Sequence, residues 1–171
     1  DQPGGGTLYS SSKTPKGYNL DAHRPASLGR RGRDLVSTRL AHNLLDLDDP
    51  TVEGLFMWAA NPLVSTPDTN RVRAGLSRPD LFTVVIDIHH TDTTAYADLG
   101  QPSTMQHEQY ELNDAYNHTY LHWNEPAVEP PGDCLPHTEI WRRLAAAMGY
   151  DDPELYLDDR SLMADLLDTD E

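Results

Sequence analysis

Two polar side chains, those of Asn61 and Asp87, directly follow two apolar runs of the chain, residues 55–60 and 82–86. A carboxylate that follows a strand can accept hydrogen bonds from ribose hydroxyls or from the N–H groups of a base, and such charge-assisted bonds contribute about 1.5–3 kcal/mol each. We therefore give Asp87 the most weight, and the chemistry that it predicts is recognition of a nucleoside. Asn61 has an alternative role, because an asparagine after a strand often bonds the backbone of its own turn.

The elements that position these two residues form a βαβ unit. The apolar runs predict strands over residues 52–60 and 82–86, and the helical pattern of residues 68–76 predicts the crossover helix between them. The strands of such a unit are parallel and end at the same edge of a sheet, so Asn61 and Asp87 are expected to lie side by side. In open α/β sheets, ligands bind at this edge. We expect an α/β fold with a mostly parallel central sheet.

Further elements follow from local patterns. Apolar residues at helical spacing predict a helix of about twelve residues from position 34, and period-two alternation predicts a strand over residues 116–124. Residues 138–148 are the clearest helix, which ends at Gly149, and a shorter helix is expected over residues 161–167. The apolar face of the clearest helix is expected in the core and consists of Ile140, Leu144 and Met148.

Three parts are expected along the chain. Residues 1–27 are rich in Gly, Ser and Pro, so they cannot bury enough apolar area to offset their ordering entropy, and a flexible lead-in is expected. Residues 28–150 are the expected α/β domain. Residues 151–171 are acidic and are expected to form a tail or a linker to a further segment. Because the sequence begins without Met in the middle of a loop, we expect a piece of a longer protein.

The charge balance and the cysteine count argue against several classes of partner and site. Lys and Arg number 13 against 28 Asp and Glu, and the net charge of −15 disfavours nucleic acid and anionic membrane surfaces, because both require a basic footprint. No apolar run approaches the roughly 18 residues of a membrane helix, and no signal peptide opens the chain, so a cytoplasmic location is expected. The single cysteine, Cys134, excludes an internal disulfide framework and a Cys-x-x-Cys cluster site.

A metal site is the alternative chemistry for the segment after the second strand. Residues of metal-ligand type occur there and further along the chain, namely Asp87, His89, His90, Asp92, His107, His118 and His122. A metal-dependent hydrolase could use such a set. However, adjacent histidines on an extended segment point to opposite faces, so His89 and His90 are not expected to share a metal ion. No His pair combines i,i+4 spacing on a helix with a Glu general base, and we favour the nucleoside site.

The motifs between residues 50 and 150 also carry a resemblance to a known family. They are, in order, Ala-Asn-Pro after the first strand, Pro-Asp-Thr-Asn-Arg-Val-Arg in the crossover helix, Asp after the second strand, Thr-Asp-Thr-Thr-Ala-x-x-Ala-Asp, and Thr-Glu-Ile-x-Arg-x-Leu-Ala-x-x-Met-Gly. This order resembles the third domain of molybdopterin-dependent oxidoreductases, the family of formate dehydrogenases, nitrate reductases and dimethyl sulfoxide reductase. The landmarks are collinear over the whole stretch.

The resemblance implies a cofactor and partners. Members of the family carry a molybdopterin guanine dinucleotide cofactor with molybdenum, and the metal ligand and the iron-sulfur cluster are expected in regions outside this chain. The resemblance implies a three-layer, Rossmann-like domain that binds the guanosine end of the cofactor but is inactive alone. Its implied partners are the remaining domains of the parent oxidoreductase and an electron-transfer subunit. The implied cofactor contacts are Asn61, Ile86, Asp87, Thr91, Gln109 and His137.

The chain departs from the family pattern at four positions. Gly100 and Gln101 replace apolar residues of a short buried strand that follows Asp98, so a weaker strand is expected there, and Asp98 itself is expected to bond a backbone turn. Gln109 stands where the family often has Lys, and His137 stands where it has Asp or Asn. Because these inherited contacts are substituted, a structural or interaction domain of the same fold stays open as the main alternative.

Overall fold

The computed structural model describes residues 19, 33, 35–48, 50–113 and 121–168. Apart from residue 19, the predicted lead-in lies outside the described residues. The chain divides into two compact units, here called the sheet unit (Arg30–Thr104 and Pro131–Leu135) and the helical unit (Asp1–Gly29, Met105–Pro130 and Pro136–Glu171). Residues 28–150, expected as one domain, are thus distributed over both units.

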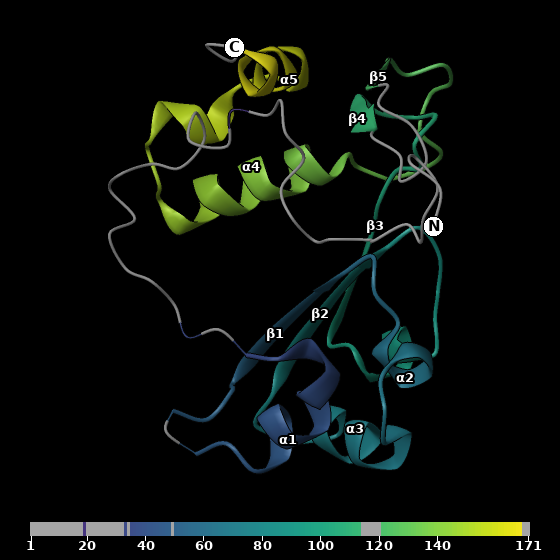
Figure 1. Ribbon diagram of the computed structural model, residues 1–171, viewed down its shortest axis with the longest axis vertical. Helices are drawn as coiled ribbons and strands as arrows, with labels where there is room; N and C mark the ends of the chain where they lie inside the picture. The colour runs from purple at the N-terminus through teal and green to yellow at the C-terminus, as the bar shows by residue number, and fades with distance from the viewer. Residues whose placement is uncertain (1–18, 20–32, 34, 49, 114–120, 169–171) are drawn as a thin grey trace, which may run out of the picture. The chain divides into compact units, whose positions relative to one another are not determined.

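The sheet unit is built on three parallel strands in the order β1-β2-β3 (Figure 1). Strand β1 (Gly54–Trp58) pairs with β2 (Phe82–Asp87), and β3 (Leu99–Pro102) pairs with the other edge of β2. The last residue of β1, Trp58, lies beside Ile86. The predicted α/β class, the parallel pairing and the shared edge of the first two strands are confirmed.

The helices of the sheet unit are shorter than the pattern of apolar residues suggests. The crossover helix is confirmed as α3 (Thr69–Leu76), but it is preceded by the unpredicted single turn α2 (Pro62–Ser65), which begins with a proline at its first position. The predicted twelve-residue helix is wrong in length, because it consists of the 3₁₀ turn η3 (Ser37–Arg39) and the six-residue helix α1 (Leu40–Leu45). A second 3₁₀ turn, η4 (Thr93–Tyr96), leads into β3.

The core of the sheet unit lies between its helices and one face of the sheet. Met57 and Val85 are paired neighbours on this face, and they pack in one buried cluster with Leu44 of α1 and Val72 of α3. The two helices approach closely, since a Cβ atom at Gly75 would lie 2.8 Å from the Cβ of Leu44. Glycine is therefore required at position 75 by packing.

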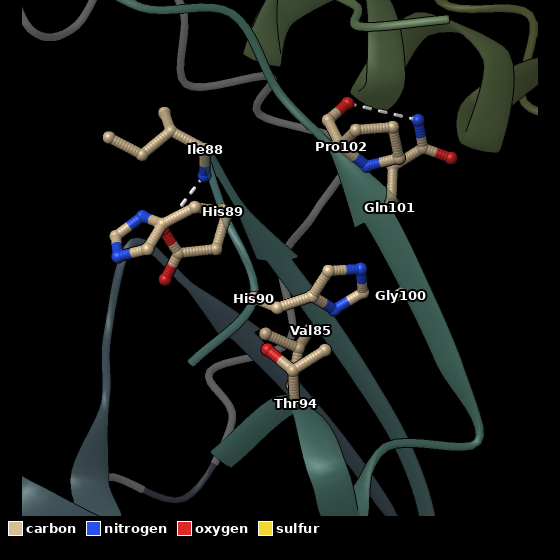
Figure 2. A pocket seen from close by; sticks show the side chains of 9 residues that line it. Val85, Ile88, His89, His90, Thr94, Gly100, Gln101 and Pro102 are labelled. Carbon is tan, nitrogen blue, oxygen red and sulfur yellow. Dashed lines mark hydrogen bonds and ion pairs between the residues drawn. The ribbon is translucent and has the colours of Figure 1, made fainter. Parts of the chain in front are cut away.

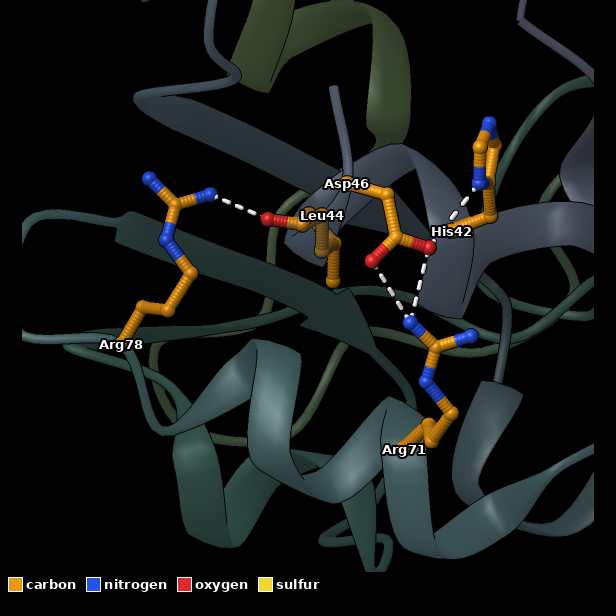
Figure 3. Close-up of polar contacts among 5 residues, drawn as sticks. All are labelled: His42, Leu44, Asp46, Arg71 and Arg78. Carbon is orange, nitrogen blue, oxygen red and sulfur yellow. Dashed lines mark hydrogen bonds and ion pairs between the residues drawn. The ribbon is translucent and has the colours of Figure 1, made fainter. Parts of the chain in front are cut away.

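An exposed polar cluster ties α1 to α3 and to the turn after it (Figure 3). The Nη2 atom of Arg71 donates to both carboxylate oxygens of Asp46 at 2.7 Å, and Nδ1 of His42 lies 3.0 Å from Oδ2 of the same carboxylate. Hydrogen bonds from Arg71, and secondly with His42, hold the pKa of Asp46 below its ordinary value. The guanidinium of Arg78 donates to the backbone carbonyl of Leu44.

The helical unit contains an antiparallel strand pair, in which β4 (Glu111–Asn113) lies beside β5 (His122–Asn124). Strand β5 forms the end of the strand that was predicted over residues 116–124, and residues 116–120 lie outside the described part of the chain. Strand β4 was not predicted, because three residues are too few to show a period-two pattern.

The long helix of this unit, α4 (His137–Met148), confirms the clearest prediction from the sequence. Gly149 ends it in the left-handed conformation, with φ of 77°. The core position predicted for Met148 is wrong, because its side chain is 60% exposed at the last turn. The turn η5 (Pro153–Tyr156) and the predicted helix α5 (Asp159–Leu167) follow. Within the described residues, no helix has the length and apolar character needed to cross a bilayer.

Candidate functional site

A cavity of about 240 Å³ opens at the carboxyl end of β2 and β3, which is the edge where the sequence predicts a ligand (Figure 2). Strand β2 contributes Val85 and Asp87 to its lining, and β3 contributes Gly100, Gln101 and Pro102. The remaining lining comes from η4, through Thr94, and from the turn after β2, through Ile88, His89 and His90. All of these residues belong to the sheet unit.

The carboxylate of Asp87 is the main polar group of this cavity. Its side chain is only 13% exposed. One oxygen, Oδ1, accepts a hydrogen bond of 2.8 Å from the backbone N–H of Ile88, and Nδ1 of His89 lies 3.8 Å from the same oxygen. The other oxygen, Oδ2, accepts no hydrogen bond from any described residue, so Asp87 is held in place with one acceptor left for a ligand.

His89 and His90 both line the cavity. In Figure 2 their imidazole rings point away from each other, as expected for adjacent residues. The chain bends at residues 88–89, directly after β2. Among the described residues, no group of three or more His, Cys, Asp or Glu is arranged to hold a metal ion.

Asn61 lies in the turn after β1 and is engaged within the protein. Its side-chain Oδ1 accepts a hydrogen bond of 2.6 Å from Oγ1 of Thr93, a residue that is completely buried. The same hydroxyl accepts from the backbone N–H of Leu63 at 3.3 Å. The bond between Asn61 and Thr93 thus joins α2 to η4. It supports the edge of the cavity, and neither of the two residues lines the cavity itself.

The other predicted residues of the sheet unit also take part in internal contacts. Ile86 is 1% exposed, and its carbonyl accepts a hydrogen bond of 2.9 Å from the N–H of Ala59. The backbone N–H of Thr91 donates to Oγ1 of Thr94 at 3.1 Å, and the two hydroxyls lie 3.1 Å apart, so Thr91 stabilises the turn before η4. As expected, Asp98 bonds the backbone, because its Oδ2 accepts from the N–H of Thr83 at 2.7 Å.

Gln109 and His137 belong to the helical unit, whereas the cavity belongs to the sheet unit. Gln109 is 9% exposed, and its backbone carbonyl accepts from the side-chain amide of Asn124 at 3.1 Å. His137 is the half-buried first residue of α4. The roles proposed for them at the cofactor stay predictions.

His89 and His90 were named only for the alternative metal site, and six further residues of the cavity were not predicted as site residues, namely Val85, Ile88, Thr94, Gly100, Gln101 and Pro102. A signal for two of them was present in the sequence, because Gly100 and Gln101 stand where the family pattern has apolar residues. The expected strand forms as β3 with four residues that pair along β2, and the expectation that it is weaker than in the family stays a prediction. The replaced positions face a cavity.

The fold and the site together define the class of this domain. It is a parallel α/β unit with a cavity at the carboxyl end of its strands, and this cavity contains a carboxylate. The family model described as Molybdopterin oxidoreductase matches residues 25–147. The chain belongs to this family, which confirms the resemblance found in its motifs.

Relatives with curated names support the same assignment. The chain is 40% identical over 167 residues to the probable oxidoreductase YoaE of Bacillus subtilis (strain 168), an alignment that covers 96% of this chain and 24% of YoaE. It is 32% identical over 111 residues to the F420-dependent formate dehydrogenase subunit alpha of Methanocaldococcus jannaschii, over 64% of this chain and 16% of that subunit. The chain thus spans a quarter or less of the length of these relatives.

A solved structure shows the same fold. The acetylene hydratase from Pelobacter acetylenicus matches with a TM-score of 0.63 and 20% sequence identity, over 80% of this chain and 19% of the hydratase. At this identity the likeness concerns the fold alone.

Proposed function

We propose that this chain is a domain of a molybdopterin-dependent oxidoreductase and that it binds the guanosine end of a molybdopterin guanine dinucleotide cofactor. The observation that carries the proposal is the carboxylate of Asp87, which is nearly buried in a cavity and has one oxygen without a described partner. Because this oxygen is open to the cavity, it can accept a charge-assisted hydrogen bond from an N–H or O–H donor of a ligand, and such a bond contributes about 1.5–3 kcal/mol. Guanine and ribose both supply such donors.

The lining of the cavity supports the nucleoside end of the cofactor over its phosphates. None of the described residues that line the cavity is Lys or Arg, and a phosphate would meet the negative charge of Asp87. The volume of about 240 Å³ is below the roughly 300–1,000 Å³ of pockets that enclose a complete drug-sized ligand. One neutral ring system with hydrogen-bond donors is therefore the group that fits.

The residues of this chain bind and orient the cofactor in this proposal. When bound, the molybdenum-pterin group would supply the redox chemistry. Asp87 holds the ring through Oδ2, while Ile88 fixes the carboxylate through Oδ1. Asn61, Ile86 and Thr91 support the loops around the cavity, and we extend the site to Gln109 and His137 on the basis of the family pattern alone.

The same proposal includes partners and location. The chain spans 24% of the length of YoaE, which supports the proposal that the metal ligand and the iron-sulfur cluster belong to further domains. We propose these domains and an electron-transfer subunit as partners. A cytoplasmic location and inactivity of the isolated chain are parts of the same proposal.

Titration of guanosine diphosphate into the 171-residue chain, followed by NMR, tests the site. We expect chemical shift changes at Asp87 and in the turn that follows it. Asp87→Asn retains an oxygen for the N–H of Ile88 but turns an NH₂ group toward the donors of the ligand. Affinity should therefore fall about ten- to a hundred-fold, which corresponds to the loss of one charge-assisted hydrogen bond.

Asp92→Asn is the matched control, since it removes the same charge from an exposed aspartate five positions further on that does not line the cavity. It should bind guanosine diphosphate as the unmodified chain does. If the shifts are distributed over the whole chain, or if Asp87→Asn and Asp92→Asn bind equally, the nucleoside site is refuted. A structural or interaction domain of the same fold would then be the better description.

A further inference from the structure

The hydroxyl of Thr93 connects two loops at the carboxyl edge of the sheet. Thr93 is the first residue of η4 and is completely buried. Its Oγ1 accepts a hydrogen bond from the backbone N–H of Leu63 in α2 at 3.3 Å, and it donates to Oδ1 of Asn61 at 2.6 Å. The segment that follows β1 is therefore joined to the segment that follows β2 through one buried hydroxyl.

These two bonds determine which end of the Asn61 amide faces Thr93. A hydroxyl has one proton to donate, and a buried donor without an acceptor is unfavourable. If the amide were turned round, its NH₂ group would face Oγ1, and the proton of Thr93 would have no acceptor among the described residues. The distance of 2.6 Å agrees with the first orientation, because O–H···O bonds span about 2.5–3.0 Å and N–H···O bonds about 2.7–3.2 Å.

The other end of the amide is the NH₂ group of Asn61, which carries two donors. This group donates to none of the described residues, and Asn61 is half-buried. Asn61 follows β1, and Asp87 ends the neighbouring strand β2. The carboxyl edge of the sheet therefore offers an oriented donor after one strand and the open acceptor Oδ2 of Asp87 at the end of the next.

We infer that Thr93 is a positioning residue, whose hydroxyl orients the Asn61 amide so that its NH₂ group donates to an acceptor oxygen of the bound nucleotide. This inference rests on the proposed function and deepens it. The cavity has room for one ring system, and Asn61 does not line it. The acceptor oxygen therefore belongs to the part of the nucleotide outside the cavity, which is the ribose or the diphosphate. Thr93 itself does not touch the ligand.

Thr93→Val and Thr93→Ser test the hydroxyl in the 171-residue chain. Valine has nearly the shape of threonine but no hydroxyl, so guanosine diphosphate affinity, measured by NMR titration, should fall about two- to tenfold, the range of one neutral hydrogen bond. Serine retains the hydroxyl and should restore most of the affinity. Thr83→Val is the matched control, because Thr83 is also completely buried but its hydroxyl has no partner among the described residues. It should bind as the unmodified chain does.

The side-chain NH₂ signals of Asn61 provide a readout that a purely structural role of Thr93 would not change. Asn61→Asp identifies these signals in the NMR spectrum, because it removes the NH₂ group and retains an oxygen for the hydroxyl of Thr93. Addition of guanosine diphosphate should shift the signals in the unmodified chain, in Thr93→Ser and in Thr83→Val. If Thr93 only joins the two loops, the signals stay in place.

The outcomes separate this inference from the proposed function. If Asp87→Asn weakens binding but Thr93→Val does not, or if valine and serine at position 93 weaken it equally, the role of Thr93 is refuted and the proposed function stands. Guanosine distinguishes the two sources of the oxygen, because a weakening by Thr93→Val for both guanosine and its diphosphate assigns the ribose, and a weakening for the diphosphate alone assigns a phosphate. If guanosine diphosphate causes no shifts at Asp87 in the unmodified chain, both proposals fail.

Discussion

Asp46 and Asp87 belong to the same unit, and each has a histidine Nδ1 near one carboxylate oxygen, at 3.0 Å and 3.8 Å respectively. Beyond that they differ. Both oxygens of Asp46 accept from Arg71 in an exposed cluster that joins two helices, whereas Asp87 is 13% exposed and only its Oδ1 accepts from a described residue. The carboxylate of Asp46 is engaged by its own chain on both oxygens, whereas that of Asp87 is held through one oxygen and has the other open to the cavity.

The glycines of the same two regions show a parallel difference. Gly75 is required because α3 packs against Leu44 of α1, and Gly100 faces a cavity in which a side chain would have room. The interface between α1 and α3 is therefore filled by its own side chains, whereas an open cavity lies at the carboxyl end of β2 and β3. The following variants test this comparison.

The largest expected effect is at the helix interface. Leu44 is 1% exposed, so Leu44→Ala should lower the free energy of unfolding by about 2–5 kcal/mol through lost burial and a cavity. Urea denaturation measures this change. The control is Leu45→Ala. Leu45 is 37% exposed, so this substitution should lower the free energy of unfolding clearly less. Equal losses in the two variants would show that α1 does not pack as described.

Gly75→Ala should also destabilise the chain. Alanine favours a helix over glycine by about 0.8–1 kcal/mol, but overpacking against the Cβ of Leu44 costs about 1–3 kcal/mol, so we expect a net loss of about 1 kcal/mol. Denaturation in urea again provides the measurement. A gain in stability would mean that the two helices can separate at no cost.

Gly100→Ala should change stability in the opposite direction. Because the methyl group meets no atom closer than 3.6 Å, the reduced backbone freedom of the unfolded chain should raise the free energy of unfolding by about 0.5–1 kcal/mol. A loss measured in the same urea experiment would show that position 100 is a packing position like position 75, and the contrast between the two regions would disappear.

The smallest expected effect is the pH dependence of the Asp46 cluster. Arg71 lowers the pKa of Asp46 in the folded chain, so its stabilisation is complete above the unfolded pKa of about 3.9 and is lost as pH falls through the lower folded value. The effect should be small because the pair is exposed. Asp46→Asn should lower the urea midpoint near neutral pH more than in acid below about pH 4. Asp48→Asn is the control, and the same pH dependence in both variants would contradict the assignment.

The sequence predicted those parts of the fold that depend on local pattern. The runs at 55–60 and 82–86 predicted two parallel strands. A start signal located the beginning of α3, and Gly149 located the end of α4. These signals could be read because they lie within a few residues of the element that they mark. The single turn α2 was missed, since four residues carry no periodic pattern.

The site was predicted less completely, because its contacts join distant positions. Asp87 could be predicted from its place after a strand. The bond between Asn61 and Thr93 spans 32 positions, and no pattern in either segment indicates it. The bend at residues 88–89 brings two histidines to one cavity, and the family pattern identified Gly100 only as an irregularity.

The sheet unit is discontinuous along the chain, and this affects how it folds. After β3 the chain leaves this unit at Thr104 and returns at Pro131–Leu135, where Leu135 forms a parallel bridge with Ser103 and accepts from the N–H of Thr104. Closing a loop of this length costs about 3 kcal/mol of chain entropy. On the ribosome, the end of β3 at Pro102 and the following Ser103 therefore lack these backbone contacts until residue 135 has emerged, and this end of an edge strand is open to wrong pairing during synthesis.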